Sequence, residues 1–164
     1  MLAGETSESV LADIATAFVD LTHSAVVELL IPLTFHASAR VRRGAVHGLL
    51  QATEQVVSRF VELAGDPDDE VRNWALFALG SLAEKGKQVD AVREAFAAHL
   101  EDPHDEARAE AILGLAHCRD ARAINPTHAG LNNETRFVHY LEEAAALISA
   151  GLGSDELRHA LRRI

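Results

Sequence analysis

Cysteine is almost absent from this sequence, because Cys118 is the single cysteine among 164 residues. One cysteine cannot form a disulfide within the chain, and such scarcity is typical of a protein that folds in a reducing compartment. Aromatic side chains are also few, at 5% of the residues, although apolar residues as a whole make up 48%. Since alanine, leucine and valine supply most of that apolar content, the composition favours a core of closely packed helices.

Positive charge and long apolar runs are lacking as well. The 15 lysine and arginine residues face 25 aspartate and glutamate residues, which gives a net charge of −10. Nucleic-acid binding draws on lysine and arginine contacts to phosphate, so this balance disfavours a nucleic-acid partner. The apolar stretch 25–35 is interrupted by Glu28 and Pro32, and residues 1–5 lack the basic start of a signal peptide. We therefore expect a cytoplasmic protein without a membrane segment.

A motif that recurs along the chain is the most informative feature present. Residues 66–72 read Asp-Pro-Asp-Asp-Glu-Val-Arg, and residues 102–108 read Asp-Pro-His-Asp-Glu-Ala-Arg. Each copy is followed by an alanine and a leucine at the same spacing, and a fainter copy begins at Val41 and Arg42. The copies are separated by 30 and 36 residues. Repeats of this length indicate stacked helical units that bury their apolar faces against one another.

Each copy of the motif also predicts the start of a helix. Asp66 and Asp102 are expected to be N-caps, because an aspartate side chain can accept hydrogen bonds from unpaired backbone N–H groups. Pro67 and Pro103 would then occupy the first helical position, where proline is tolerated. The acidic residues that follow would stabilise the positive ends of the helix dipoles.

Apolar periodicity and breaker residues predict how one domain, residues 1–164, is organised. We expect a capping helix at 6–22 and three helical pairs at 24–53, 56–85 and 88–118, with Pro32 bending or ending the first helix of the first pair. Within these pairs, the helices are expected at about 24–35 and 38–53, 56–64 and 67–84, and 88–100 and 103–118. Residues 120–150 are expected to form an irregular repeat, because asparagine, proline and glycine interrupt the helical pattern between 125 and 133. That interruption favours either a shortened helix or an ordered loop. A last helix is expected at 154–164.

The motif at 66–72, with the alanine and leucine that follow it, resembles HEAT repeats of the bacterial bilin-lyase-like type. The resemblance is most specific at 66–80, covers 24–122 well and extends loosely over 123–164. It implies an all-α fold, a right-handed α-α superhelix of about four helical pairs with capping helices at both ends. It also implies that the second helices line a concave groove and that the chain binds another macromolecule.

The resemblance further implies a structural role for one arginine in each repeat. Arg42, Arg72 and Arg108 would link neighbouring repeats through acidic residues near helix starts. A helical wheel places Arg72 at the flank of its helix, which favours pairing of Arg72 and Arg108 with Asp69 or Asp105 over ligand binding. The first repeat departs from the family pattern, because His-Ala-Ser at 36–38 replaces Asp-Pro-Asp.

The same wheel identifies a strip on the second helices that varies between repeats. Its members mix apolar and polar side chains, as a protein-binding patch does; those we expect to contact a partner are Arg43, His47, Asn73, Phe77 and Leu113. The alternative is that neighbouring helices bury Phe77 and Leu113. Trp74 lies at the edge of the apolar arc, so core packing is favoured over a role as a binding anchor.

Catalytic and metal-binding patterns are missing from the sequence. Nine histidines are present, yet none is followed by glutamate, and Cys118 has no cysteine partner. A His-Glu-x-x-His pattern, which would place two metal ligands on one helix face, does not occur. We therefore expect no metal, no cofactor and no enzymatic activity.

Several functions remain open from the sequence. The leading hypothesis is a monomeric, non-enzymatic interaction module or adaptor that binds a protein partner in its groove, with the segment 125–133 as a secondary contact. A specific version is an inhibitor or immunity-type protein that masks a basic partner. The enzymatic alternatives are a HEAT-like DNA glycosylase, in which Trp74 would act with Asp68 or Glu110, and a chromophore lyase, which rests on fold analogy alone.

Overall fold

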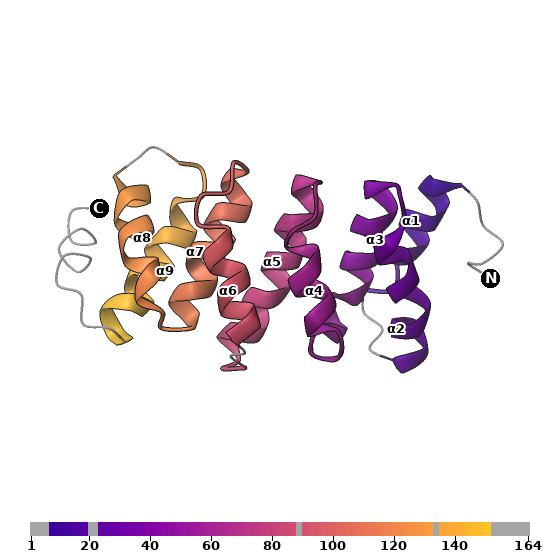
Figure 1. Ribbon diagram of the computed structural model, residues 1–164, viewed down its shortest axis with the longest axis horizontal. Helices are drawn as coiled ribbons and strands as arrows, with labels where there is room; N and C mark the ends of the chain where they lie inside the picture. Colours follow the sequence, from indigo (N-terminus) through magenta and orange to yellow (C-terminus); the bar gives the residue numbers. More distant parts are fainter. Residues whose placement is uncertain (1–6, 20–22, 88–89, 133–134, 152–164) are drawn as a thin grey trace. The chain divides into compact units, whose positions relative to one another are not determined.

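The computed structural model describes residues 7–19, 23–87, 90–132 and 135–151, and the secondary structure within these ranges is helical (Figure 1). In chain order the elements are α1 (Glu8–Thr16), α2 (Ser24–Leu30), η2 (Ile31–Phe35), α3 (Ala39–Leu49), η3 (Leu50–Gln55), α4 (Val57–Leu63), α5 (Asp69–Glu84), α6 (Asp90–Ala98), α7 (Asp105–His117), η4 (Ala121–Ala123), α8 (Ile124–Leu131) and α9 (Val138–Gly151), where η marks a 3-10 helix. The helix expected at 154–164 lies outside the described residues.

The chain divides into two compact units, residues 1–78 and 79–164, and the division falls inside α5. In the first unit α1 packs against α3, and η2 packs against both α2 and α3. In the second unit α7 packs against α6 and α9, while α8 packs against α9. Each unit therefore builds its own core from helices that are close in sequence.

Prolines set helix boundaries in ways that depend on their position. The helix expected at 24–35 ends as α2 at Leu30, and η2, with Pro32 in its first turn, continues the chain as a 3-10 helix. Pro126, in contrast, lies in the first turn of the eight-residue helix α8, where its missing N–H leaves no helical bond unmade. The segment that the sequence left open between a short helix and a loop is therefore mostly helical.

The turn before α5 differs from the one that the sequence predicted. The cap of α5 is Asp68, whose Oδ1 accepts the N–H of Val71 at 3.1 Å. Asp66 lies two residues earlier and accepts the N–H of Asp68 at 2.9 Å, so it closes the turn that leads into the helix. The prediction that Asp66 is the N-cap is wrong, because the second aspartate of the motif takes that role.

The turn before α7 repeats this arrangement. His104 is the N-cap, and its Nδ1 accepts the N–H of Ala107 at 3.4 Å. Asp102 accepts the N–H of His104 at 2.9 Å and thus occupies the same place as Asp66. The prediction of an N-cap at Asp102 is wrong for the same reason.

Two glycines of α3 allow α1 to approach very closely. A methyl group added at Gly44 would stand 2.5 Å from the carbonyl oxygen of Ala12, and one added at Gly48 would stand 2.2 Å from that of Ala15. Both distances are far below contact distance, so the two backbones meet where only glycine fits. This contact fixes α1 against the first repeat.

Candidate functional site

Three rings from α3 and α5 form one cluster in the first unit, which we call the aromatic patch: His47, Trp74 and Phe77. The ring centroids of His47 and Trp74 are 4.0 Å apart, with an angle of 53° between the planes. Those of Trp74 and Phe77 are 5.5 Å apart at 78°, which is an edge-to-face contact. Since Trp74 and Phe77 are three residues apart on one helix, they lie on the same face of α5.

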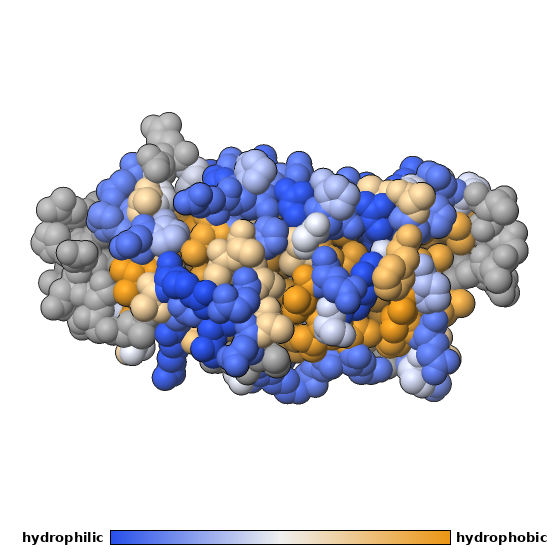
Figure 2. Space-filling model, viewed as in Figure 1, coloured by the Kyte–Doolittle hydropathy of each residue, from blue (hydrophilic) through white to orange (hydrophobic). Residues whose placement is uncertain are grey.

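The aromatic patch is only partly covered by the rest of the molecule. Phe77 is 40% exposed, and Trp74 and His47 are half-buried. Trp74 thus packs between two rings and still reaches the surface, so it combines core packing with access to a partner. The exposed large apolar side chains among the described residues are Val10, Leu29, Phe35, Phe77 and Val138. Figure 2 shows apolar areas between hydrophilic side chains on one face of the molecule.

The surroundings of His47 lower its pKa and so disfavour the charged imidazolium. Burial lowers its pKa, the nearby charge of Arg43 lowers it further, and Glu70 acts in the opposite direction. Arg43 itself is half-buried, and within the described parts of the chain its guanidinium has no ion-pair partner. The edge of the patch therefore offers one cation beside three rings.

The remaining predicted contact residues differ in accessibility. Asn73 is only 4% exposed, and its Oδ1 has no hydrogen-bond partner among the described residues. The expectation that Asn73 presents a polar contact at the surface is therefore wrong for this structure. Leu113 lies on α7 in the second unit and is half-buried.

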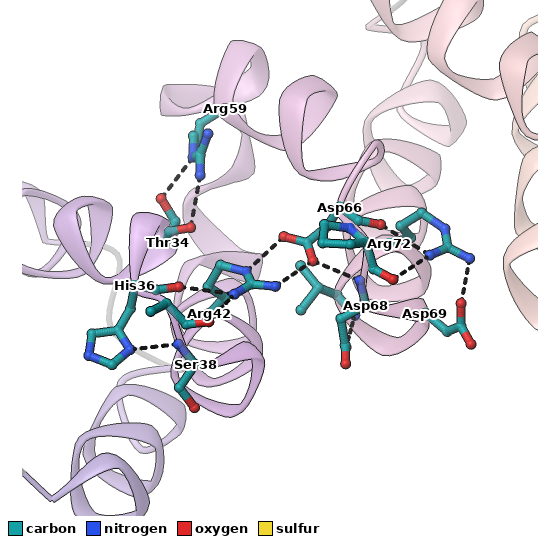
Figure 3. Close-up of polar contacts among 12 residues, drawn as sticks. Thr34, His36, Ser38, Arg42, Arg59, Asp66, Asp68, Asp69 and Arg72 are labelled. Carbon is teal, nitrogen blue, oxygen red and sulfur yellow. Dashed lines mark hydrogen bonds and ion pairs between the residues drawn. The ribbon is translucent and has the colours of Figure 1, made fainter.

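The arginine of the first repeat forms an ion pair between two repeats (Figure 3). Arg42 donates from Nε and Nη2 to the two carboxylate oxygens of Asp66, at 2.8 and 2.7 Å. Its Nη1 donates to the backbone oxygens of His36 and Ala37, at 3.0 and 2.9 Å. Arg42 therefore links α3 to the turn before α5. Its acidic partner is Asp66, for which the sequence predicts a helix cap.

Asp69 and Asp105, the acidic residues predicted to pair with the other two arginines, bond to the arginine of their own repeat. Arg72 Nη2 donates to Asp69 at 2.6 Å, and its Nη1 donates to the backbone oxygen of Asp66 at 3.0 Å. Arg108 makes the corresponding bonds to Asp105 and to the backbone oxygen of Asp102. Because partners three residues apart belong to one helix start, the Asp69 and Asp105 bonds order the turn of their own repeat.

The residues considered for catalysis are engaged in structural contacts. Asp68 caps α5, as described above. Glu110 is 4% exposed, and burial raises its pKa to about 7 although a hydrogen bond from Tyr140 lowers it. Cys118 is buried, and burial raises the pKa of its thiol, which disfavours the reactive thiolate. In the described part of the chain, no group of three or more metal-ligating side chains comes together.

None of the helices within the described ranges has the length and apolar character that crossing a bilayer requires.

Comparisons with known proteins agree with this architecture. A family model described as HEAT repeats matches residues 1–80. Protein YibA of Escherichia coli (strain K12) is 31% identical over 114 residues, which are 69% of this chain and 40% of that protein. The matched part of the chain thus spans less than half of the length of that curated relative.

Solved structures show the same fold. The X-ray structure of YibA from E. coli has a TM-score of 0.75 and 23% identity, and the match covers 100% of this chain and 66% of that one. A designed armadillo repeat protein, solved in complex with the peptide (KR)4, has a TM-score of 0.66 and 19% identity, with coverage of 95% and 79%. The fold is therefore an all-helical repeat solenoid.

Proposed function

Because the chain is a HEAT-repeat protein, we propose that it is a non-enzymatic module that binds a protein partner through the aromatic patch and Arg43. Repeat solenoids commonly present extended binding surfaces, and each repeat adds side chains to that surface. The observation that carries the proposal is the exposure of Phe77 at 40% beside the half-buried Trp74. Because the Phe77 ring is partly exposed to solvent, it stabilises the core less than a fully buried ring of the same size would.

The composition of the patch suits protein recognition. Tryptophan, tyrosine and arginine dominate the binding energy of most protein interfaces, and such anchors lie in well-packed surroundings. Trp74 is held in place by two neighbouring rings, so its orientation is fixed before a partner arrives. Arg43 would supply a charged hydrogen-bond donor at the edge.

A basic partner is the second candidate, and it is favoured by the charge of the chain. The net charge of −10 would speed association with a basic protein and would make that association depend on salt. The designed armadillo repeat protein that shares this fold was solved with a basic peptide, (KR)4. If the partner is basic, the association rate should fall steeply with added salt, whereas a neutral partner should associate at a rate that salt hardly changes.

The experiment that tests the binding module is affinity capture from an extract of the source cell with three versions of the chain. These are the wild type, the patch variant Arg43→Ala with Phe77→Ala, and the control Leu29→Ala with Lys85→Ala. Leu29 is 39% exposed, close to the exposure of Phe77, but lies on the first helix of its pair. Circular dichroism establishes that all three versions are equally helical.

We expect a protein that the wild type and the control retain and the patch variant loses. Identical captured proteins for all three versions would refute the role of the patch. Trp74 is the single tryptophan of the chain, so its fluorescence provides an independent readout for a captured partner. Binding at the patch should shift the emission of Trp74, and binding elsewhere should leave it unchanged.

A further inference from the structure

The second unit contains a cavity of about 540 Å³ between α7, α8 and the start of α9. Apolar side chains form much of its wall, among them Ala109, Ile112, Pro126, Phe137 and Leu141. Arg108 and Thr135 also line it. A cavity of this size, with a mostly apolar wall and a few polar groups, is typical of small-molecule sites.

Thr135 occupies the place that an aspartate holds in the two preceding repeats. Asp66, Asp102 and Thr135 each lie three residues before the first residue of a helix, namely of α5, α7 and α9. Each side chain accepts the backbone N–H of the residue two positions later, at 2.9, 2.9 and 3.2 Å respectively. The turn is therefore conserved within the chain, but its third copy has a hydroxyl group instead of a carboxylate.

The first copy shows what the missing carboxylate does. Asp66 uses both of its oxygens to bind Nε and Nη2 of Arg42, the arginine of the preceding repeat. Thr135 has one side-chain oxygen, and that oxygen already accepts the N–H of Phe137. Arg108 is the arginine of the repeat before Thr135, so it stands where Arg42 stands. Among the described residues, no carboxylate of the following turn bonds to it.

Arg108 retains capacity for a further partner. Its Nη1 and Nη2 donate to the backbone oxygen of Asp102 and to the carboxylate of Asp105. Within the described ranges its Nε makes no hydrogen bond, and its side chain is 36% exposed. A guanidinium with a free donor thus lies in the wall of the cavity, beside the place that a carboxylate fills in the first repeat.

We propose that this cavity binds a small carboxylic acid with an apolar body. The carboxylate of the ligand binds the guanidinium of Arg108 in the way that the carboxylate of Asp66 binds that of Arg42. The apolar body of the ligand packs against Ile112, Phe137 and Leu141. Arginine and carboxylate form strong, directional pairs because two N–H donors match two oxygens. The inference does not depend on the aromatic patch, which belongs to the first unit.

The charges around the cavity are compatible with an anion. Glu101 and Asp105 also line it, and Asp105 already pairs with Arg108. Arg136 does not itself line the cavity, but its guanidinium lies over the ring of the wall residue Phe137, 4.6 Å from the ring centroid, and so places a second positive charge next to the wall. Among the described residues, Arg108 and Arg136 therefore match Asp105 and Glu101 in number.

The test uses hexanoate as the probe, with chemical shifts of the ¹⁵N-labelled full chain as the measurement. Hexanol and hexylamine serve as the neutral and cationic probes with the same apolar body. The first variant is Arg108→Met, which removes the guanidinium. The second is Thr135→Asp, which places a carboxylate of the chain itself at the position that Asp66 and Asp102 occupy in the other turns. The matched controls are Thr135→Asn, which keeps the turn without a charge, and Lys85→Met, which removes an exposed cation outside the cavity.

We expect saturable shifts with hexanoate at α7, α8 and the start of α9, and none with hexanol or hexylamine at equal concentration. Affinity should fall about tenfold or more in Arg108→Met, because a charge-assisted hydrogen bond is lost. Thr135→Asp should abolish hexanoate binding and raise the thermal unfolding midpoint. Thr135→Asn and Lys85→Met should bind hexanoate as the wild type does.

Several results would overturn the proposal. These are the absence of saturable binding to the wild type, equal binding of hexanol, and unchanged hexanoate affinity in Thr135→Asp. If Arg108→Met does not fold, the comparison of Thr135→Asp with Thr135→Asn decides, because only the aspartate can occupy the carboxylate position. Equal hexanoate affinity in those two variants contradicts the proposed site.

Discussion

Asp66 holds Arg42 through both of its carboxylate oxygens while it closes the turn that leads into α5. Its Oδ2 accepts from Arg42 Nε at 2.8 Å, and its Oδ1 accepts from Arg42 Nη2 at 2.7 Å and from the N–H of Asp68 at 2.9 Å. Burial raises the pKa of Asp66, but the hydrogen bonds from Arg42 and Asp68 outweigh it and leave the pKa below its usual value. One side chain thus couples two repeats.

The Asp66→Asn variant should lose about 3 kcal/mol of unfolding free energy at pH 7, because it leaves Arg42, whose side chain is only 13% exposed, without its counter-ion. The folded pKa of Asp66 is lower than the unfolded one, so its contribution is present above the unfolded pKa of about 3.9 and is lost as the pH falls through the folded pKa. Urea unfolding at a series of pH values measures both effects, and the variant should lack the part of the acid dependence due to Asp66.

Asp69→Asn is the matched control for that prediction. Asp69 also pairs with an arginine, but its side chain is 59% exposed and its partner lies three residues away on the same helix. Exposed pairs of this kind contribute about 1 kcal/mol or less. An Asp66→Asn variant that lost no more stability than Asp69→Asn would contradict the coupling of the two repeats by Asp66.

Much of the helical organisation could be predicted from the repeated motif. The second helix of the central repeat was expected at 67–84 and is observed at Asp69–Glu84, and the next was expected at 103–118 and is observed at Asp105–His117. The ends agree because apolar periodicity and breaker residues define them. The starts differ because the motif offers two candidate capping positions, and sequence alone does not show which one closes the preceding turn.

The candidate sites could be predicted only in part. The helical wheel placed His47 and Phe77 on one strip, and the structure joins them through Trp74. It also placed Asn73 on that strip, but a wheel describes one helix and does not show how widely its neighbours cover it. The cavity beside Arg108 was missed, although the replacement of aspartate by Thr135 in the third turn was a signal in the sequence.

Gly48→Ala should destabilise the chain, although alanine favours a helix over glycine by about 1 kcal/mol. The new methyl group would stand 2.2 Å from the carbonyl oxygen of Ala15, so α1 would have to move away from α3. Thermal unfolding followed by circular dichroism measures the change. Gly80→Ala is the control, because the nearest atom to its methyl group, Oε2 of Glu110, is 3.8 Å away. Gly80→Ala should be neutral or stabilising, and an equal loss in both variants would contradict the prediction.

The fluorescence of Trp74 should report the protonation of His47. Their ring centroids are 4.0 Å apart, and a protonated imidazole in contact with an indole quenches its emission. Burial and the charge of Arg43 lower the pKa of His47, so the quenching should have its midpoint below the usual value of 6.5. A His47→Asn variant should show no such transition. A midpoint at or above 6.5 in the wild type would show that His47 is more accessible than the structure indicates.

Glu110 should make the chain less stable as the pH rises from about 4 toward neutrality. Burial raises its pKa to about 7, Glu106 and Glu143 act in the same direction, and the hydrogen bond from Tyr140 opposes them. The folded state therefore favours the protonated carboxyl, so stability should fall between the unfolded pKa of about 4.3 and the folded pKa, by roughly 3 kcal/mol, and then level off. In urea unfolding, the stability of Glu110→Gln should match that of the wild type at about pH 4 and exceed it at about pH 8. The control is Glu84→Gln at an exposed position, which should have little effect at either pH. If Glu110→Gln were no more stable than the wild type at pH 8, ionisation of the Glu110 carboxyl would not lower the free energy of unfolding, and the prediction would be wrong.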